Sequence, residues 1–380
     1  MSKQPQNQTY SAANIPKLTP QEHVRKRPGM YVGGTDKRAL HNMLWYVVEE
    51  ASAEALQFPD LNEITITFLN DTQIRITDNG MGIPVTVHKS GKPVFEVYMT
   101  DHGLRRENYV ISKSNDLSAG GLHAIHMFMM NALCIECIAE TKVAGFLWQQ
   151  TYSEGVATSS VEQIRPLADG ESTGTSITFT PDFTIMDKGL TFDYDLIVER
   201  CRELAYMLPH VTFRVEREDQ SVEPVIWHYP AGIRDWIAEV NKEIATLHPV
   251  LYKDFSGEYE YKHGKHTIRV ELAFQFRTLD AGEIKSFVNT IPVPEGGTHI
   301  DGLNESLLTA IYGDAHSDLI DPLNGLIAIL HIYHPDPQFQ SQTKVELLNP
   351  EVKEAVMDCV EVLLAENMDI HAQLQGYFRI

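Results

Sequence analysis

The sequence predicts a protein of mixed α/β class with two domains. The chain has 380 residues, which is more than one hydrophobic core usually supports. Stretches with apolar residues at helical spacing alternate with stretches in which every second residue is apolar. The polar stretch REDQSVEP at 217–224 interrupts this pattern, so a domain boundary is predicted near residue 226.

The first predicted domain follows residues 1–20, which lack periodicity and are expected to form an extended arm. A helix is predicted across residues 40–55, with Asp36 as its N-cap, and a β-hairpin across 63–78. The polar stretch 101–121 is expected to be a lid loop. Further predicted elements are a helix from about residue 122, strands at 134–139, 146–152 and 175–180, a helix at 193–208 and a strand at 211–217.

The second predicted domain again mixes helices and strands. A helix is expected at 232–244, and strands are expected at 266–276 and 323–335. The last predicted helix spans 349–368, with Asn349 as N-cap and Pro350 in its first turn.

Composition is that of an ordinary water-soluble protein, with 43% hydrophobic and 22% charged residues. A formal net charge of −21 argues against DNA binding by this chain alone. No secretion signal or stretch long enough to span a membrane is visible, which predicts a cytoplasmic protein without membrane contact. Cys134 and Cys137 form a C-x-x-C on a predicted strand, where they would face opposite sides, so we expect core packing rather than a metal site.

Seven short motifs follow one another along the chain. They are VRKRPGMYVG (24–33), TDNGMGIP (77–84), GGLH (120–123), NAL (131–133), TGT (173–175), IPVPEGGTHIDG (291–302) and PDPQFQSQTK (335–344). In this order they resemble the N-terminal region of the B subunits of DNA gyrase and topoisomerase IV. That region has an ATPase domain, of the class shared with Hsp90, histidine kinases and MutL, and a transducer domain. The resemblance extends from Tyr10 to about residue 365.

The resemblance implies an α+β fold. A two-layer α/β sandwich would hold the nucleotide, and a second α/β domain, the transducer, would contain a left-handed β-α-β crossover, against the usual handedness. It divides the chain into a dimerisation arm (1–20), an ATPase-like domain (21–226) and a transducer-like domain (227–380).

The resemblance also assigns a nucleotide site. Asp78 would bind adenine, Gly82 would lie under the base, and Thr175 would join them through water. Glu50 stands at the position that ligates Mg²⁺, for which a carboxylate is suited. The nucleotide-binding residues implied are Glu50, Asp78, Gly82, Ile83, Pro84, Thr175, Gln342 and Lys344, the last two reaching the terminal phosphate from the transducer. The simpler alternatives are that Asp78 is a turn residue and that Thr175 reflects β propensity.

The catalytic half of this site departs from the family pattern. Tyr46 stands where the family has the glutamate that activates water, and a phenol with a pKa near ~10 is a poor general base at neutral pH. Glu49 is the nearest substitute, but we expect it to be rotated away as a solvated helix residue.

The lid and two arginines are also changed. The family's GLHGVG is GLHAIH here, so Ala124 and His126 place side chains where the phosphates would bind to bare amides. Met81 replaces an arginine, which removes the partner of Glu54, and Gln149 replaces another.

These losses predict a pseudo-ATPase with no catalytic residue and no metal ligand that can be assigned with certainty. ATP or ADP would bind weakly at most, and the role of Mg²⁺ stays open. The first alternative is an ATP-binding topoisomerase module with re-routed catalysis, for instance through Glu49 and Glu50. The second is a decoy that captures small molecules directed at gyrase.

The expected assembly is a homodimer in which the arm, anchored by Tyr10 and Ile15, crosses to the neighbouring subunit. A subunit of gyrase or topoisomerase IV is a further possible partner. Only NMDIHAQLQGYFRI follows the helix 349–368, so DNA cleavage by this chain alone is not expected.

Overall fold

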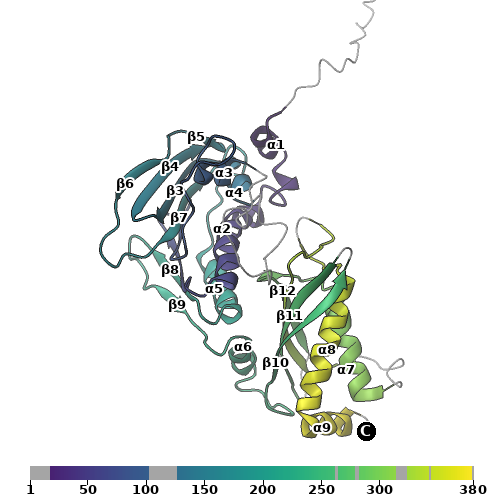
Figure 1. Ribbon diagram of the computed structural model, residues 1–380. Helices are drawn as coiled ribbons and strands as arrows, with labels where there is room; N and C mark the ends of the chain where they lie inside the picture. The colour runs from purple at the N-terminus through teal and green to yellow at the C-terminus, as the bar shows by residue number, and fades with distance from the viewer. Residues whose placement is uncertain are drawn as a thin grey trace, which may run out of the picture.

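A computed structural model describes residues 18–101, 126–261, 264–278, 282–313, 323–341 and 344–378 (Figure 1). Several predictions fall outside these residues. They concern Tyr10 and Ile15 in the arm, nearly all of the lid stretch 101–121, Ala124 in the GLHAIH motif, and Gln342.

The first part of the chain forms a sheet of nine described strands. In spatial order they are β5 (Val156–Ala157), β4 (Phe146–Ser153), β3 (Cys134–Val143), β7 (Gly174–Pro181), β2 (Ile74–Asp78), β1 (Glu63–Phe68), β8 (Thr212–Arg217) and β9 (Val225–Trp227), with β6 (Glu162–Pro166) also paired to β4. The predicted hairpin is present, since β1 and β2 pair antiparallel with Ile66 opposite Ile76. Only β1 and β8 pair in parallel within this sheet as described.

Helices cover one face of this sheet (Figure 1). They are α1 (Pro20–Lys26), α2 (Lys37–Gln57), α3 (Val94–Thr100), α4 (His126–Ala132) and α5 (Tyr194–Met207). The Asp36 side chain caps α2 by accepting a hydrogen bond from the Ala39 N–H, as predicted. The apolar side chains of α2 and the inward residues of β1 and β2 belong to one buried core, so the central helix is fixed against the strands that carry Asp78.

The second part contains a five-stranded sheet ordered β10 (Leu251–Tyr261), β11 (Gly264–Phe276), β14 (Leu326–Tyr333), β12 (Glu283–Val288) and β13 (Ile291–Pro292). Its helices are α7 (Thr298–Tyr312), α8 (Pro350–Glu366) and α9 (Met368–Phe378), while α6 (Ile233–Val240) lies between the two sheets in the sequence. β12 and β14 pair in parallel, and α7 lies between them in the chain. This β-α-β unit is where the resemblance places the crossover.

The predicted fold class is confirmed, but several elements differ from the sequence-based prediction. The helix at 232–244 ends at Val240, and α3, β10, α7 and α9 were not predicted. Asn349 does occupy the N-cap of α8, but its side chain makes no capping hydrogen bond. Cys134 and Cys137 are buried and form no disulfide, which agrees with core packing. Among the described residues, no group of His, Cys, Asp or Glu could hold a metal ion.

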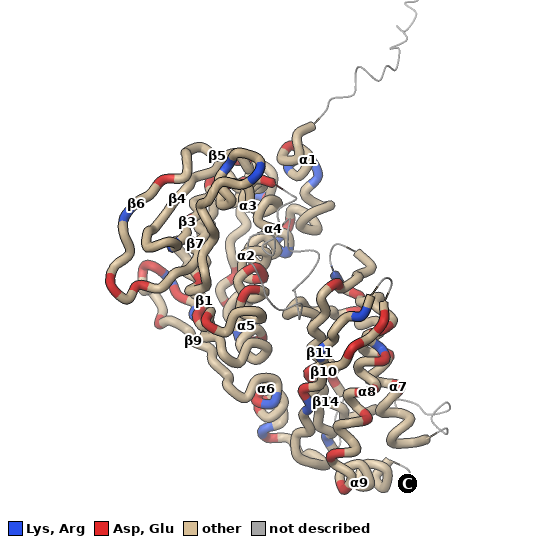
Figure 2. The backbone as a smooth tube through the Cα atoms, in the orientation of Figure 1, with Lys and Arg blue, Asp and Glu red and all other residues tan. Residues whose placement is uncertain are grey.

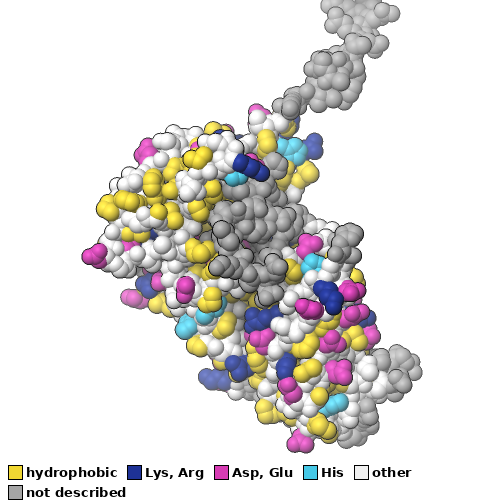
Figure 3. Space-filling view, viewed as in Figure 1, with side chains coloured by type: hydrophobic (Ala, Val, Ile, Leu, Met, Phe, Trp, Pro, Cys, Tyr) yellow, Lys and Arg dark blue, Asp and Glu magenta, His cyan; other side chains and the backbone are white. Residues whose placement is uncertain are grey.

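The surface is acidic and mixed. Figure 2 shows Asp and Glu spread over both parts of the chain, with Lys and Arg scattered between them. In Figure 3, hydrophobic side chains gather over the part of the first sheet that contains β4 and β6. The helices of the described segments are all too short or too polar to cross a bilayer.

Gly82 supplies a test of the fold. Gly82 and Gly91 both have positive φ angles, +72° and +83°, so alanine is strained at either position. A Cβ at Gly82 would lie only 2.6 Å from the Lys142 carbonyl oxygen, whereas Gly91 has open space around it. We expect Gly82→Ala to lower the free energy of unfolding by about 1–2 kcal/mol more than Gly91→Ala in urea titrations. Equal losses would contradict this packing.

Candidate functional site

Asp78 ends β2 and lies at one end of the candidate site. Its Oδ1 accepts hydrogen bonds from the backbone N–H groups of Gly80 (2.9 Å) and Thr175 (3.2 Å). Burial raises the pKa of the Asp78 carboxyl to about 6, although both N–H donors act in the opposite direction. The carboxyl is therefore held in a fixed orientation by backbone on both sides.

Thr175 faces the same small cavity. Its Oγ1 is buried and has no hydrogen-bond partner among the described residues. The cavity has a volume of about 20 Å³, and its lining includes Asp78, Thr175, Tyr98 and Met127. That volume suits about one water molecule, which would satisfy the Thr175 hydroxyl, and is far below the ~300–1,000 Å³ of pockets for small molecules. A purine base does not fit this cavity.

The turn after Asp78 packs against β3. The space beside Gly82 is filled by backbone and by the Thr141 side chain, and Thr141 Oγ1 accepts a hydrogen bond from the Ile83 N–H at 2.7 Å. Ile83 is buried and Pro84 is half-buried. These contacts explain Gly82 and Ile83 by packing alone, and a nucleotide role for them stays a prediction.

Glu54 pairs with the backbone of Met81, the residue that stands at the position of the family's arginine. It is buried on α2, and its Oε1 accepts a hydrogen bond from the Met81 N–H at 2.7 Å. Gln149, at the other changed arginine position, donates to Glu140 Oε1 at 3.1 Å. The Gln149 side chain thus takes part in the protein's own hydrogen bonding, whereas Met81 does so only through its backbone.

Tyr46 occupies the expected position of the general base on α2. Its hydroxyl donates to the Tyr31 carbonyl oxygen, and its ring stacks on His126 with centroids 4.2 Å apart and an interplanar angle of 10°. Burial, and then the nearby Glu49, raise the pKa of the phenol further above its usual value. Tyr46 is therefore a packed structural residue and cannot accept a proton from water.

His126 begins the described part of α4 and is fully buried. Its Nδ1 lies 3.6 Å from Glu49 Oε2 and 3.8 Å from Glu50 Oε1, and its Nε2 lies 3.4 Å from Lys344 Nζ. The Lys344 ammonium is itself 3.7 Å from Glu49 Oε2. Our expectation that Glu49 is solvated is wrong, because its side chain is only 15% exposed and faces this cluster.

Glu50 is engaged by a residue that the sequence did not single out. Tyr98 of α3 is buried and donates its hydroxyl to Glu50 Oε2 at 2.7 Å. The only sequence signal was the apolar run VFEVYMT, which is also typical of a simple core segment. With Glu50 held by Tyr98 and close to His126, the described residues do not form an open Mg²⁺ position.

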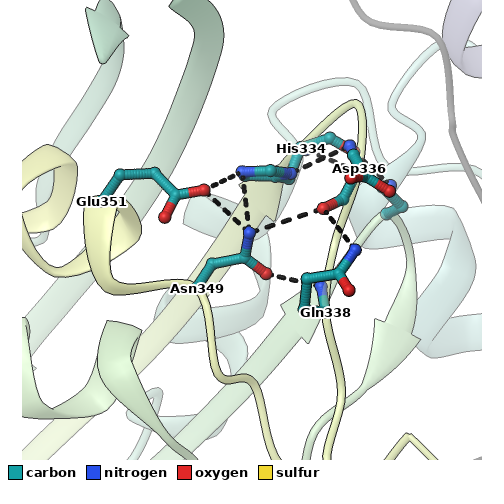
Figure 4. Close-up of polar contacts among 6 residues, drawn as sticks. His334, Asp336, Gln338, Asn349 and Glu351 are labelled. Carbon is teal, nitrogen blue, oxygen red and sulfur yellow. Dashed lines mark hydrogen bonds and ion pairs between the residues drawn. The ribbon is translucent and has the colours of Figure 1, made fainter. Parts of the chain in front are cut away.

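A polar cluster in the second part holds the chain on either side of Lys344 (Figure 4). The Asp336 N–H donates to His334 Nδ1 at 3.0 Å, so the ring proton is on Nε2, which contacts Glu351 Oε1 at 2.9 Å. Asn349 donates to the same carboxylate oxygen at 2.7 Å. Burial alone would raise the pKa of Glu351, but the hydrogen bonds from His334 and Asn349 lower it. Residues before and after Lys344 are thereby tied together.

The structure therefore brings together most of the predicted residues but not in an open site. Asp78, Thr175 and Glu50 line the small cavity, while His126 lies close to Glu50 on one side and to Lys344 on the other. The cluster around His126 contains the carboxylates of Glu49 and Glu50, the ammonium of Lys344 and the stacked rings of Tyr46 and His126.

Comparisons with known proteins agree with the motifs. The DNA gyrase B family matches residues 232–375. The chain is 35% identical over 364 residues to the B subunit of DNA gyrase from Haloferax volcanii, covering 92% of this chain and 55% of that protein. It is 32% identical over 377 residues to the corresponding gyrase protein of Thermotoga maritima, covering 96% and 58%. The chain thus spans a little over half the length of these relatives.

A solved structure shows the same arrangement. It is the 43K ATPase domain of Thermus thermophilus gyrase B in complex with an aminocoumarin, at a TM-score of 0.72 and 27% identity, covering 94% of this chain and 93% of that one. The resemblance inferred from the motifs and the predicted fold of an ATPase-like part followed by a transducer are confirmed.

Asp78 provides a test by pH. Because the pKa is about 6 in the folded protein against 3.8 ordinarily, the folded protein retains a proton between these values that the unfolded chain has released. This group makes the free energy of unfolding fall as pH rises from about 4 to 6. Asp78→Asn keeps an acceptor for both N–H groups and removes the titration.

We expect the stability of Asp78→Asn relative to wild type to increase by on the order of 2 kcal/mol between pH 4 and pH 7, measured by urea unfolding. Asp60→Asn, at an exposed position, is the control for replacing a carboxyl group by an amide. A difference that does not change with pH would show that the Asp78 carboxyl titrates normally.

Proposed function

We propose that this chain, which has the sequence pattern and the fold of the ATPase and transducer region of gyrase B subunits, is a module that does not hydrolyse ATP. One observation carries the proposal. The region expected to receive the phosphates is filled by the buried side chains of Tyr46, His126 and Lys344 together with Glu49. The module would act by dimerising or by binding a partner protein.

The chemistry supports this proposal. Hydrolysis requires a base within hydrogen-bond reach of water, and loss of a general base typically costs ~10²–10⁴ in rate. Tyr46 cannot serve, and Glu49 and Glu50 already face Lys344, His126 and Tyr98. A phosphate would have to displace several buried contacts before it could bind.

The adenine end would add little affinity. Asp78 and Thr175 remain in place, but the cavity between them holds about one water and not a base. ATP and ADP would therefore bind weakly at most, and Glu50 offers no free carboxylate for Mg²⁺. The decoy alternative would need the larger cavity of about 340 Å³ that Asp78 and Thr175 also line.

The relatives are named as B subunits of DNA gyrase, which supports assembly of this chain with another subunit. The arm of residues 1–20, with Tyr10 and Ile15 as apolar anchors, would cross to a second copy of this chain. A subunit of gyrase or topoisomerase IV is the other candidate partner. The net charge of −21 disfavours DNA as a ligand of this chain alone.

A second candidate is a working ATPase with re-routed catalysis. One observation favours it, because Glu49 lies 3.6 Å from His126, and a carboxylate beside an imidazole is a common acid–base arrangement. Turnover separates the two candidates directly.

We expect no ATP hydrolysis above background, with or without DNA, in a steady-state phosphate-release assay. Tyr46→Glu is also expected to be inactive, because His126 and Lys344 still fill the phosphate region. Asp78→Asn is the control, since genuine turnover through this site would fall in that variant and a contaminant would not. Steady release from wild type that Asp78→Asn abolishes would refute the pseudo-ATPase.

We also expect a homodimer at micromolar concentration without nucleotide. A phosphate region that is already filled removes the need for ATP to order the interface. Sedimentation of the full chain should give a dimer, and deletion of residues 1–18 should give a monomer. A monomeric intact chain, or a dimer that survives the deletion, would contradict exchange of the arm.

A further inference from the structure

We propose that Glu49, His126 and Lys344 form a latch that fixes the transducer segment around Lys344 on the ATPase-like part without nucleotide. Glu49 lies on α2 and His126 on α4 in the first part, whereas Lys344 comes from the segment between β14 and α8 in the second. The inference rests on the proposed function, because side chains of the protein would here hold Lys344 in the place of a phosphate.

In the latch, His126 lies between Lys344 of the second part and Glu49 of the first part. The ammonium of Lys344 can donate to His126 Nε2 at 3.4 Å, which leaves the ring proton on Nδ1, directed toward Glu49 Oε2 at 3.6 Å. Lys344 also contacts Glu49 directly at 3.7 Å. A neutral imidazole with its proton on Nδ1 would therefore present an acceptor to Lys344 and a donor to Glu49.

Because Lys344 and His126 are buried, their contacts restrict where the Lys344 side chain can lie. Lys344 is 4% exposed and His126 is fully buried. Burial lowers the pKa of the Lys344 ammonium, whereas Glu49 and then Glu50 raise it. A buried ammonium is tolerated only when it is paired, so Lys344 has to stay beside these carboxylates or move into water.

The segment that carries Lys344 is fixed from its own side. The backbone of Lys344 has φ +56°, and its N–H donates to the Ser341 carbonyl at 3.0 Å. The Glu295 N–H donates to the Val345 carbonyl at 2.9 Å. Together with the His334–Glu351 contact in Figure 4, these bonds orient Lys344 before it meets the first part.

Other contacts join the two parts elsewhere. Arg200 of α5 donates to the Thr290 carbonyl at 2.6 Å, and Lys285 of β12 lies 3.2 Å from Glu203. Loss of the latch should therefore free the segment around Lys344 without separating the parts. Lys285 supplies a matched control. Its ion pair with Glu203 also joins the two parts, but the Lys285 side chain is 37% exposed.

The experiment uses hydrogen–deuterium exchange of the full chain without nucleotide. Glu49→Lys and Lys344→Glu each place like charges together, and the double variant restores an opposite pair with reversed polarity. We expect each single variant to speed exchange of residues 344–349 and of α4 by at least about tenfold. The double variant should recover most of the protection, and Lys285→Glu should leave these segments unchanged.

The single variants are checked for folding by thermal unfolding, and the recovery in the double variant shows that any loss is specific to the pair. Rapid exchange of residues 344–349 in wild type, or no recovery in the double variant, would overturn the latch. ATP turnover is measured on the same samples. Turnover in wild type would refute the proposed function, whereas an open segment without turnover would refute the latch alone.

Discussion

The buried imidazole of His126 is the contact on which the rest of the site depends. Its face stacks on Tyr46, one edge faces Glu49 and Glu50, and the other meets Lys344. The ring thus lies beside an ammonium and two carboxylates, and the ammonium of Lys344 also contacts Glu49 directly. The helix that would carry a base, the start of α4 and the transducer segment are thereby joined into one packed unit.

The two ends of the site differ in why their residues are retained. At the Asp78 end, Gly82, Ile83 and Thr175 have packing or backbone roles that hold whether or not a ligand binds. At the Lys344 end, the side chains of Glu49, His126 and Lys344 contact one another within the chain. A family pattern kept in the sequence can therefore reflect the demands of the fold as much as those of binding.

Much of the fold was predictable from the sequence because local patterns dictate it. The alternation in 63–78 predicted the hairpin, and Asp36 predicted the start of α2. Tyr98 and Glu49 could not be placed, because their environment is set by elements far along the chain. Nothing in the sequence near Asn349 indicates that its amide binds Glu351 instead of capping α8. The contacts of Tyr98 with Glu50 and of Glu49 with Lys344 join segments far apart in the chain, and such pairing is decided by tertiary packing, which single-sequence patterns do not encode.

The stack of Tyr46 on His126 also affects how easily these two residues could be replaced by those of the family pattern. Replacing either ring alone would leave the other beside a void or next to a buried charge, and core substitutions of that kind usually lower stability. Under the proposed function, regaining ATP hydrolysis would thus require several coordinated changes, each unfavourable by itself. Strong epistasis between α2 and α4 is the expected result, and it would tend to preserve the altered site across descendants even without selection for a new role.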